Sequence, residues 1–414
     1  MTSSEAAPLG ARRATLIQPL RILMVAPTSF FADYGCHVRI LEEARALQAR
    51  GHVVRVCTYH NGRDVPGIDI RRSVDVPWLK RTEVGSSRHK AYLDVALCVA
   101  TLRQARAFQP DVIHGHLHEG ALIGAVIGRV MRLPVIFDYQ GSLTEEMLDH
   151  RFIRPGGLRE RFFRRLERLI DSLPDVIVPS GAAAQQYLLE RGVSSERVCL
   201  VPDGVDTAWL DPGRASDARA ATRARLGIPA SAPVIVYLGL LAEYQGTDLL
   251  LRAAQRLRER CPDAYLLVAG YPGADRYAQL ARELALDGHV LFPGRVPYED
   301  APALLAAGDV AVAPKLSLTE SNGKLLNYMA MRLPVVAFDS PANRAILGGL
   351  GHLVPPGAAE ELADALLDAL SDPPAARDAL RQRILNHFAW SERVRDLEAV
   401  YERVLGRRLR TEES

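Results

Sequence analysis

Short runs of apolar, mostly β-branched residues alternate with longer amphipathic stretches along almost the whole chain. The first unit reads RILMVAP, then GCHVRILEEARALQARGH, then VVRVCTYH; later runs include DVIHGH, LPVIFDY and DVIVPS. Continuous apolar runs that are bounded by Pro, Gly or Asp and separated by helical patterns are typical of parallel strands buried on both faces. The alternation therefore predicts a doubly wound α/β fold.

The alternation is interrupted once, over residues 201–233, where turn residues flank a short helical pattern rich in Ala and Arg. It restarts at VIVYLGL, and a chain of 414 residues exceeds what one hydrophobic core usually supports. We predict two Rossmann-like domains that face each other across a cleft. The predicted divisions are a disordered start (1–19), an N-terminal domain (20–204), a linker (205–232), a C-terminal domain (233–385) and a C-terminal helix packed back on the first domain (386–414).

Composition and charge exclude several classes of protein. The formal net charge is only +2, so nothing in the overall charge points to nucleic acid as a partner. The five cysteines are far apart and include no CxxC pair, which argues against a disulfide framework and a zinc cluster and fits a reducing cytoplasm. No apolar run approaches the roughly 18 residues of a membrane span. We expect a cytoplasmic protein that is neither secreted nor membrane-spanning.

A polar loop separates two apolar runs of the second domain, in TESNGKLLNYMAM (residues 319–331). Ligands of such sheets bind where strands end, and a helix N-terminus can hold a phosphate if a glycine lets the backbone approach. Ser321, Asn322, Gly323 and Lys324 supply these features. They also fit an ordinary N-cap without a ligand. Lys324 favours the anion site, because a cation in the first turn opposes the helix dipole.

The order of segments resembles a retaining glycosyltransferase of family 4, the nucleotide-sugar-dependent group with the GT-B fold. The resemblance extends over about residues 20–400 and rests on GHVVRVCT, PDVIHGH, VPDGVD, YLGLLAEYQGTDLLLRAA, LLVAGYPG, FPGRVPYEDAPALLAAGDVAVAP and ESNGKLLNYMAMRLPVVAFD. Each segment is weak alone, but their order and spacing together are specific. The resemblance implies an enzyme whose C-terminal half binds a nucleotide-sugar donor and whose N-terminal half binds an acceptor.

The resemblance also implies roles for the polar loop. Glu320 would contact the hydroxyls of the donor sugar, and the amides from Asn322 to Leu325 would hold the diphosphate. Asn327 stands where the family has a second glutamate for the ribose, with six residues between the two positions rather than the usual seven. An amide can still bind a vicinal diol, without the strength of a charged acceptor. A helix residue that faces solvent is the alternative interpretation of Asn327.

The glycine loop after the first strand of the second domain departs from the family pattern. The family has Gly-Arg-Leu and then Lys-Gly, whereas this chain has GLL at 239–241 and QG at 245–246. Two cations that would neutralise the leaving diphosphate are therefore missing, although stabilising such charge is usually the largest catalytic contribution. Lys315 and Lys324 are the only lysines of the second domain. We predict that Lys324 replaces the missing cations with help from Lys315; Lys315 reaching solvent is the alternative.

The base of the nucleotide would be held by backbone groups of Gly270 and Tyr271 and of Arg295 and Val296, which leaves UDP and GDP donors open. Glu320 and Lys324 are the catalytic candidates of this half. The predicted donor-binding residues are Gly239, Gln245, Gly270, Tyr271, Val296, Lys315, Ser321, Asn322, Gly323, Leu325 and Asn327.

In the first domain, HGHLH puts His114, His116 and His118 at alternating positions, which a continuing strand would project on one face. Such a trio could bind a metal, but we expect the strand to end near His116, and no acidic residue at helical spacing completes a site, so we predict no metal site. The resemblance instead points to His116 near the cleft, and to Asp138 and Gln140 in FDYQGS near the donor sugar.

Retention in this family is usually explained by front-face attack, in which a donor phosphate oxygen takes the acceptor's proton. Glu119 and Asp138 are the alternative bases, and His116 and Asp138 are the catalytic candidates of this half. Gly35 would let substrates approach the backbone closely, or it forms a simple turn. The predicted acceptor-side residues are Gly35, His118, Glu119 and Gln140.

Residues 151–168 carry seven arginines against two acids, interleaved with Phe152, Phe162, Phe163 and Leu166. Such a basic amphipathic segment can lie on anionic lipid. A solvated helix whose phenylalanines face the core is the alternative.

Together these features predict a retaining, metal-independent hexosyltransferase that needs no cofactor. It would move a sugar from a UDP- or GDP-sugar to a glycan or lipid-linked acceptor, in the cytoplasm or peripherally at the inner face of the membrane. Two other classes stay open: a GT-B sugar-nucleotide epimerase or phosphorylase, and a catalytically silent glycosyltransferase-like partner subunit.

Overall fold

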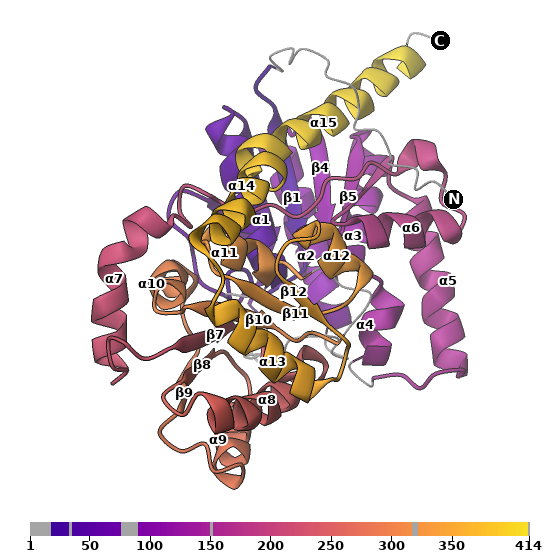
Figure 1. Ribbon diagram of the computed structural model, residues 1–414. Helices are drawn as coiled ribbons and strands as arrows, with labels where there is room; N and C mark the ends of the chain where they lie inside the picture. The colour runs from indigo at the N-terminus through magenta and orange to yellow at the C-terminus, as the bar shows by residue number, and fades with distance from the viewer. Residues whose placement is uncertain (1–17, 33–34, 76–89, 150–151, 317–321, 413–414) are drawn as a thin grey trace, which may run out of the picture.

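Two six-stranded parallel sheets, each covered by helices on both faces, make up the chain (Figure 1). The computed structural model describes residues 18–32, 35–75, 90–149, 152–316 and 322–412. The strand orders are β3-β2-β1-β4-β5-β6 and β12-β11-β10-β7-β8-β9, and every pairing between these strands is parallel. The predicted α/β class with two doubly wound domains is therefore confirmed.

The N-terminal domain contains the first six strands. They are β1 (Arg21–Ala26), β2 (Val53–Thr58), β3 (Asp69–Arg72), β4 (Val112–His116), β5 (Val135–Tyr139) and β6 (Val176–Pro179). Its helices are α1 (Gly35–Ala49), α2 (Lys90–Phe108), α3 (Leu117–Met131), α4 (Leu143–Asp149), α5 (Leu158–Ser172) and α6 (Ala182–Glu190), followed by a 3₁₀ turn (Ser195–Arg197).

The C-terminal domain repeats this plan. Its strands are β7 (Val234–Leu238), β8 (Tyr265–Ala269), β9 (Val290–Gly294), β10 (Val310–Ala313), β11 (Val335–Phe338) and β12 (His352–Val354). Its helices are α8 (Thr247–Arg260), α9 (Ala274–Glu283), α10 (Ala301–Ala306), α11 (Lys324–Ala330), α12 (Pro341–Leu347), α13 (Ala359–Leu370) and α14 (Pro374–His387), with 3₁₀ turns at Glu243–Gln245 and Tyr298–Asp300.

Alternate residues of each strand pack against helices on opposite faces of the sheet. In β1, Ile22 and Met24 face a core that includes residues of α1 and of α15 (Trp390–Glu412), whereas Leu23 and Val25 face α2 and α3. α3 contacts α2 on one side and α5 on the other. None of the helices in the described part of the chain is both long and apolar enough to cross a membrane.

The two segments that connect or follow the domains are structured. The predicted linker, 205–232, contains α7 (Pro212–Arg225), which packs on α10 of the second domain. In α7, Arg223 donates to Asp309 at the start of β10. After α14 the chain returns to the first domain, where α15 lies against α1 (Figure 1).

Glu42 of α1 joins the two domains through buried hydrogen bonds. Its carboxylate accepts from the hydroxyl of Tyr298 at 2.6 Å and from the indole N–H of Trp390 at 2.8 Å. Tyr298 in turn stacks on Trp209, with ring centroids 4.1 Å apart. Burial raises the pKa of Glu42 to about 7, although the Tyr298 hydrogen bond acts in the opposite direction. A carboxyl group between the domains thus titrates near neutral pH.

We expect the free energy of unfolding to fall as the pH rises from about 4.5 to about 7, because Glu42 ionises in the unfolded chain before it does in the folded one. The fall attributable to Glu42 is roughly 1.4 kcal/mol for each unit that separates the two pKa values. Glu42→Gln should remove it. Urea unfolding over this pH range measures the difference between wild type and variant. Glu402→Gln, at an exposed position of α15, is the matched control, and parallel curves for wild type and Glu42→Gln would contradict the assignment.

We also expect Gly115→Ala to lower the free energy of unfolding by about 1–3 kcal/mol. A Cβ atom at Gly115, in β4, would lie 2.5 Å from the backbone oxygen of Gly120, in α3, so strand and helix would have to separate. Gly406→Ala in α15 is the control: a Cβ there meets no atom within 4 Å, and alanine favours a helix interior. Chemical denaturation compares the two variants. Equal effects would mean that close packing at Gly115 does not matter.

Candidate active site

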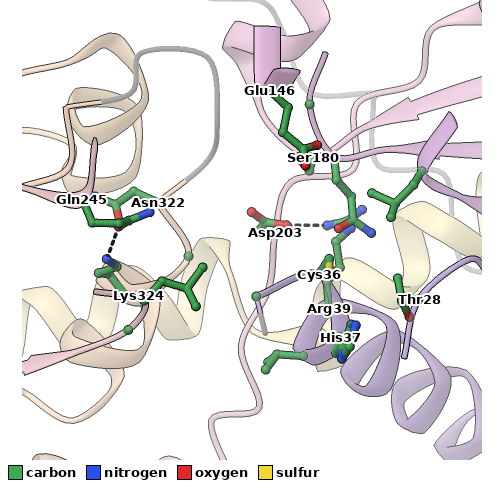
Figure 2. Close-up of a pocket in the computed structure, with 18 of the residues that line it drawn as sticks. Thr28, Cys36, His37, Arg39, Glu146, Ser180, Asp203, Gln245, Asn322 and Lys324 are labelled. Atoms are coloured by element: carbon green, nitrogen blue, oxygen red, sulfur yellow. Dashed lines mark hydrogen bonds and ion pairs between the residues drawn. The ribbon is translucent and has the colours of Figure 1, made fainter. Parts of the chain in front are cut away.

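A cleft of about 440 Å³ lies between the domains. Its walls come from the residues that follow β1, β4, β5 and β6 of the first sheet and β7, β8 and β10 of the second. Because all these strands are parallel within their sheets, their carboxyl ends open into the same space. In Figure 2, Lys324, Gln245 and Asn322 lie on one side of the cleft, and Arg39, Asp203 and Ser180 lie on the other.

Most of the predicted site residues line this cleft. They are Gly35, His118, Glu119, Gln140, Gly239, Gln245, Gly270, Tyr271, Val296, Lys315, Asn322, Gly323, Lys324 and Asn327. Arg295 lies over the ring of Tyr271, 5.0 Å from its centroid. Glu320 and Ser321 lie outside the described residues, so their predicted roles stay predictions.

Arg295 does not line the cleft, and neither do three of the predicted catalytic and donor-binding residues. The side chain of Leu325 is fully buried in the core of the second domain, and its N–H donates to the carbonyl of Asn322 at 2.9 Å. His116 and Asp138 are fully buried beneath the cleft. They can affect a bound substrate only through the groups that they hold.

Lys324 extends from α11 to the glycine loop after β7. Its ammonium donates to the side-chain oxygen of Gln245 at 2.6 Å and to the hydroxyl of Tyr237 at 3.3 Å. It also lies 4.7 Å from the centroid of the Tyr237 ring, where a cation is favoured. A Cβ atom at Gly239 would be 3.1 Å from this ammonium. The cation therefore lies beside Gln245, which replaces the family's Lys, and beside Gly239 of the same loop.

Gly246 fixes the turn that presents Gln245. Its φ is +75°, and a Cβ there would lie 1.9 Å from the carbonyl oxygen of Pro314. No larger residue fits without moving the strand end. One residue beyond Pro314, Lys315 is only 7% exposed and lines the cleft. This burial disagrees with the alternative in which Lys315 reaches bulk solvent.

A buried ionic network forms the floor of the N-terminal side. Arg39 of α1 donates to Asp138 at 2.7 Å and to Asp203 at 2.8 Å, and lies 3.0 Å from Glu43. Burial alone would raise the pKa of Asp138, but the charge of Arg39 and the contact with His116 outweigh it and hold that pKa well below its usual range. Asp138 is thus an ionised anchor, and burial together with the charge of Asp138 raises the pKa of Glu43.

Asp138 connects this network to the cleft. It is 2.9 Å from Nδ1 of His116, and it accepts a hydrogen bond from the side-chain amide of Gln140 at 2.7 Å. Since Gln140 lines the cleft, the network fixes the orientation of a group that a ligand can touch. Asp138 therefore positions the side chain of Gln140, and His116 helps to hold Asp138 in place.

The three histidines of HGHLH do not share one environment. His114 stacks on His116, and Nδ1 of His114 is 2.8 Å from the hydroxyl of Tyr401. Burial lowers the pKa of His114 well below its usual value. His118 belongs to α3, lies 3.5 Å from Glu167 and contacts the ring of Phe137. The trio thus divides because β4 ends at His116.

The fold also brings Glu43 and Asp138 close to His114 and His116, which the sequence pattern did not predict. Potential metal-ligand atoms of Glu43, His114, His116 and Asp138 lie within 4.8 Å of one another. Arg39, however, makes close ion pairs with both carboxylates. It already supplies the positive charge that a metal ion would bring, so these residues fit a metal poorly.

Sequence reasoning missed Arg39, Glu42 and Asp203, which all line the cleft. A sequence signal existed for Asp203, which lies inside the VPDGVD segment. Arg39 and Glu42 lie away from the apolar stripe of α1 and are buried all the same, so the helical periodicity does not mark them.

Comparison with known proteins gives consistent results for both halves of the chain. Residues 34–204 match the glycosyl transferase 4-like domain, and residues 232–372 match glycosyl transferases group 1. The D-inositol 3-phosphate glycosyltransferase of Corynebacterium aurimucosum is 31% identical over 322 residues, which cover 72% of this chain and 73% of the relative. The phosphatidyl-myo-inositol mannosyltransferase of Mycobacterium tuberculosis is 26% identical over 407 residues, covering 94% and 98%.

The crystal structure of Anabaena HepE in complex with UDP and glucose is similar in fold. It superposes with a TM-score of 0.74 at 17% identity, covering 92% of this chain and 99% of that one. The same family is indicated by the two matched domains and by the relative that is 31% identical, and the two parallel sheets fit its fold. The chain belongs to glycosyltransferase family 4 and has the GT-B fold.

Proposed function

We propose that this protein is a retaining glycosyltransferase that uses a nucleoside-diphosphate sugar as donor and a glycan or a lipid-linked compound as acceptor. The observation that carries the proposal is the position of the Lys324 ammonium, 2.6 Å from Gln245 in the loop where the family's leaving-group cations normally stand. A lysine of a different helix thus supplies a positive charge at the place where the family's cations are missing. This is the charge that the departure of a diphosphate requires.

The donor half of the cleft fits a nucleoside diphosphate. Lys324 and Lys315 give two positive charges on the wall that Gly239 and Gly270 also line. The base would stack or hydrogen-bond near Tyr271, and the ribose would meet Asn327. HepE, which shares the fold, is known with UDP and glucose bound. A UDP- or GDP-sugar is therefore the proposed donor.

The proposed reaction needs no protein nucleophile. The bond between the sugar's anomeric carbon and the phosphate oxygen breaks, and the acceptor oxygen forms its bond on the same face of the sugar. The acceptor's proton passes to the oxygen of the leaving diphosphate, whose charge Lys324 and Lys315 stabilise. These two cations can do the electrostatic work that a divalent metal does elsewhere, so we propose a metal-independent reaction. Glu119, which lines the cleft, is the alternative base.

The acceptor is proposed to bind against the N-terminal wall, where Gln140, His118 and Gly35 face the donor. The two relatives are named for inositol 3-phosphate and for phosphatidyl-myo-inositol. An acceptor with several hydroxyls suits a wall that is lined by Gln140 and Asp203. None of the five cysteines, which all lie in the described part of the chain, forms a disulfide, and this supports the proposed cytoplasmic location.

We expect Lys324→Ala to weaken nucleotide binding by about ten- to a hundredfold, the equivalent of roughly 1.5–3 kcal/mol for a hydrogen bond to a charged group. Calorimetry and thermal shift with UDP, GDP, ADP and their sugars measure it. Arg256→Ala, an exposed cation of α8 in the same domain, is the control. Undiminished binding by Lys324→Ala would refute the cation replacement. A wild type that binds nucleotide without turnover would favour the silent partner subunit.

We further expect Gln245→Lys to restore most of the binding that Lys324→Ala removes. The two side chains meet at 2.6 Å, so a lysine at 245 puts its ammonium where that of Lys324 now lies. The double variant is compared with each single variant in the same titrations. Additive losses in the double variant would show that charge at this point is not what Lys324 contributes.

A further inference from the structure

Three neighbouring helices of the N-terminal domain expose an unusual number of large apolar side chains. In each helix these residues recur at helical spacing and form a stripe. The stripes consist of Tyr92, Val95 and Val99 on α2; Leu122, Val126 and Val130 on α3; and Leu158, Phe162, Leu169 and Leu173 on α5 and its C-cap. Since α3 contacts both α2 and α5, the stripes belong to one surface, which we call the α2–α3–α5 face.

The exposure of these side chains is large. Leu158 is 82% exposed, Val95 and Val130 are 66% exposed, and Phe162 is 61% exposed. In the C-terminal domain, by contrast, Leu385 at 38% is the one comparable residue among those described. Soluble proteins rarely gather exposed apolar residues on one surface unless that surface binds something.

The charges on the same face have a single sign. Wherever exposure is described in these three helices, the exposed charged residues are arginines: Arg103, Arg106, Arg129, Arg159, Arg161, Arg165 and Arg168. The acids whose exposure is described in these helices are either buried or only partly exposed. Asp94 accepts from Tyr59, Glu160 pairs with Arg164, and Glu167 and Asp171 are buried.

We propose that the α2–α3–α5 face docks on an anionic lipid bilayer. The three helices would lie parallel to the membrane, with Phe162, Leu169 and the valines at the boundary of head groups and acyl chains. The arginines would contact lipid phosphates, and their long stems can extend along the apolar stripes. The face thus enlarges the basic segment 151–168 by two further helices.

Electrostatics argues against a second copy of this chain as the occupant. A symmetric pairing of two such faces would oppose arginine to arginine, and the described part of the face offers no exposed acid to compensate. A bilayer that contains anionic lipid supplies both the apolar interior and the negative charge.

The docked orientation would bring the acceptor side of the cleft close to the membrane. The first turn of α3, one of the three helices, contains His118 and Glu119, which line the cleft. Leu143 and Glu146 of α4, a helix that contacts α5, line it as well. Delivery of a lipid-linked acceptor along this route rests on the proposed transferase function, whereas docking itself does not.

Vesicle flotation with the full-length protein tests the proposal. We expect wild type to bind vesicles of phosphatidylcholine and phosphatidylglycerol but not vesicles of phosphatidylcholine alone, and to dissociate at high salt. Phe162→Ser with Leu169→Ser, and separately Arg161→Glu with Arg165→Glu, should each lower the bound fraction about tenfold. Leu385→Ser with Arg282→Glu, a matched change on the C-terminal domain, should bind like wild type.

Thermal unfolding and nucleotide titration accompany each variant, because all the substituted side chains are exposed and both properties should be unchanged. The proposal is overturned if wild type ignores anionic vesicles, or if the matched control loses binding equally. A wild type that sediments as a dimer without lipid, and as a monomer after Phe162→Ser with Leu169→Ser, would instead assign the face to a second copy. Failure of nucleotide binding in wild type would count against the proposed function and not against docking.

Discussion

The guanidinium of Arg39 holds the N-terminal half of the cleft together. It joins α1 to Asp138 at the end of β5, which lies beneath the cleft, and to Asp203 in the loop after β6, which lines the cleft. Three residues along the same helix, Glu42 reaches across to Tyr298 of the other domain. One turn of α1 thus holds the residues of the cleft floor in place and also contacts the second domain.

This arrangement depends on a balance of buried charge. Arg39 faces the carboxylates of Asp138, Asp203 and Glu43, and a buried excess of negative charge is costly. The protein relieves the excess in two ways: Asp203 keeps some contact with solvent, and Glu43 has a raised pKa, so that its neutral form is favoured. Asp138 remains the charged partner because Arg39, His116 and Gln140 all contact it.

The sequence pattern was sufficient for the features that depend on local periodicity. Most strands of the two sheets follow from an apolar run, but β3, with the sequence DIRR, does not. The glycine loop lies at the end of β7 as expected, whereas residues 317–321 of the polar loop lie outside the described residues. The pattern could not supply contacts between distant segments: Glu42 and Trp390 are 348 residues apart, as are Arg50 and Glu398. The separation of His118 from His114 and His116 was predicted correctly, because the strand was expected to end near His116 and does end there.

Departures from a family pattern at two places in the chain become one feature in three dimensions. The loss of lysine at 245 and the presence of lysine at 324 look unrelated in sequence, yet the two side chains are in contact. The α2–α3–α5 face also arises only in three dimensions. Each helix alone exposes three or four large apolar residues, and the three helices together form one apolar surface. A net charge of +2 conceals this surface, because acids elsewhere cancel its arginines in the sum. Salt screens the interaction between exposed charges beyond about one Debye length, which is shorter than the whole molecule. The charge of the face itself, and not the net charge of the chain, therefore decides whether the face is attracted to an anionic surface.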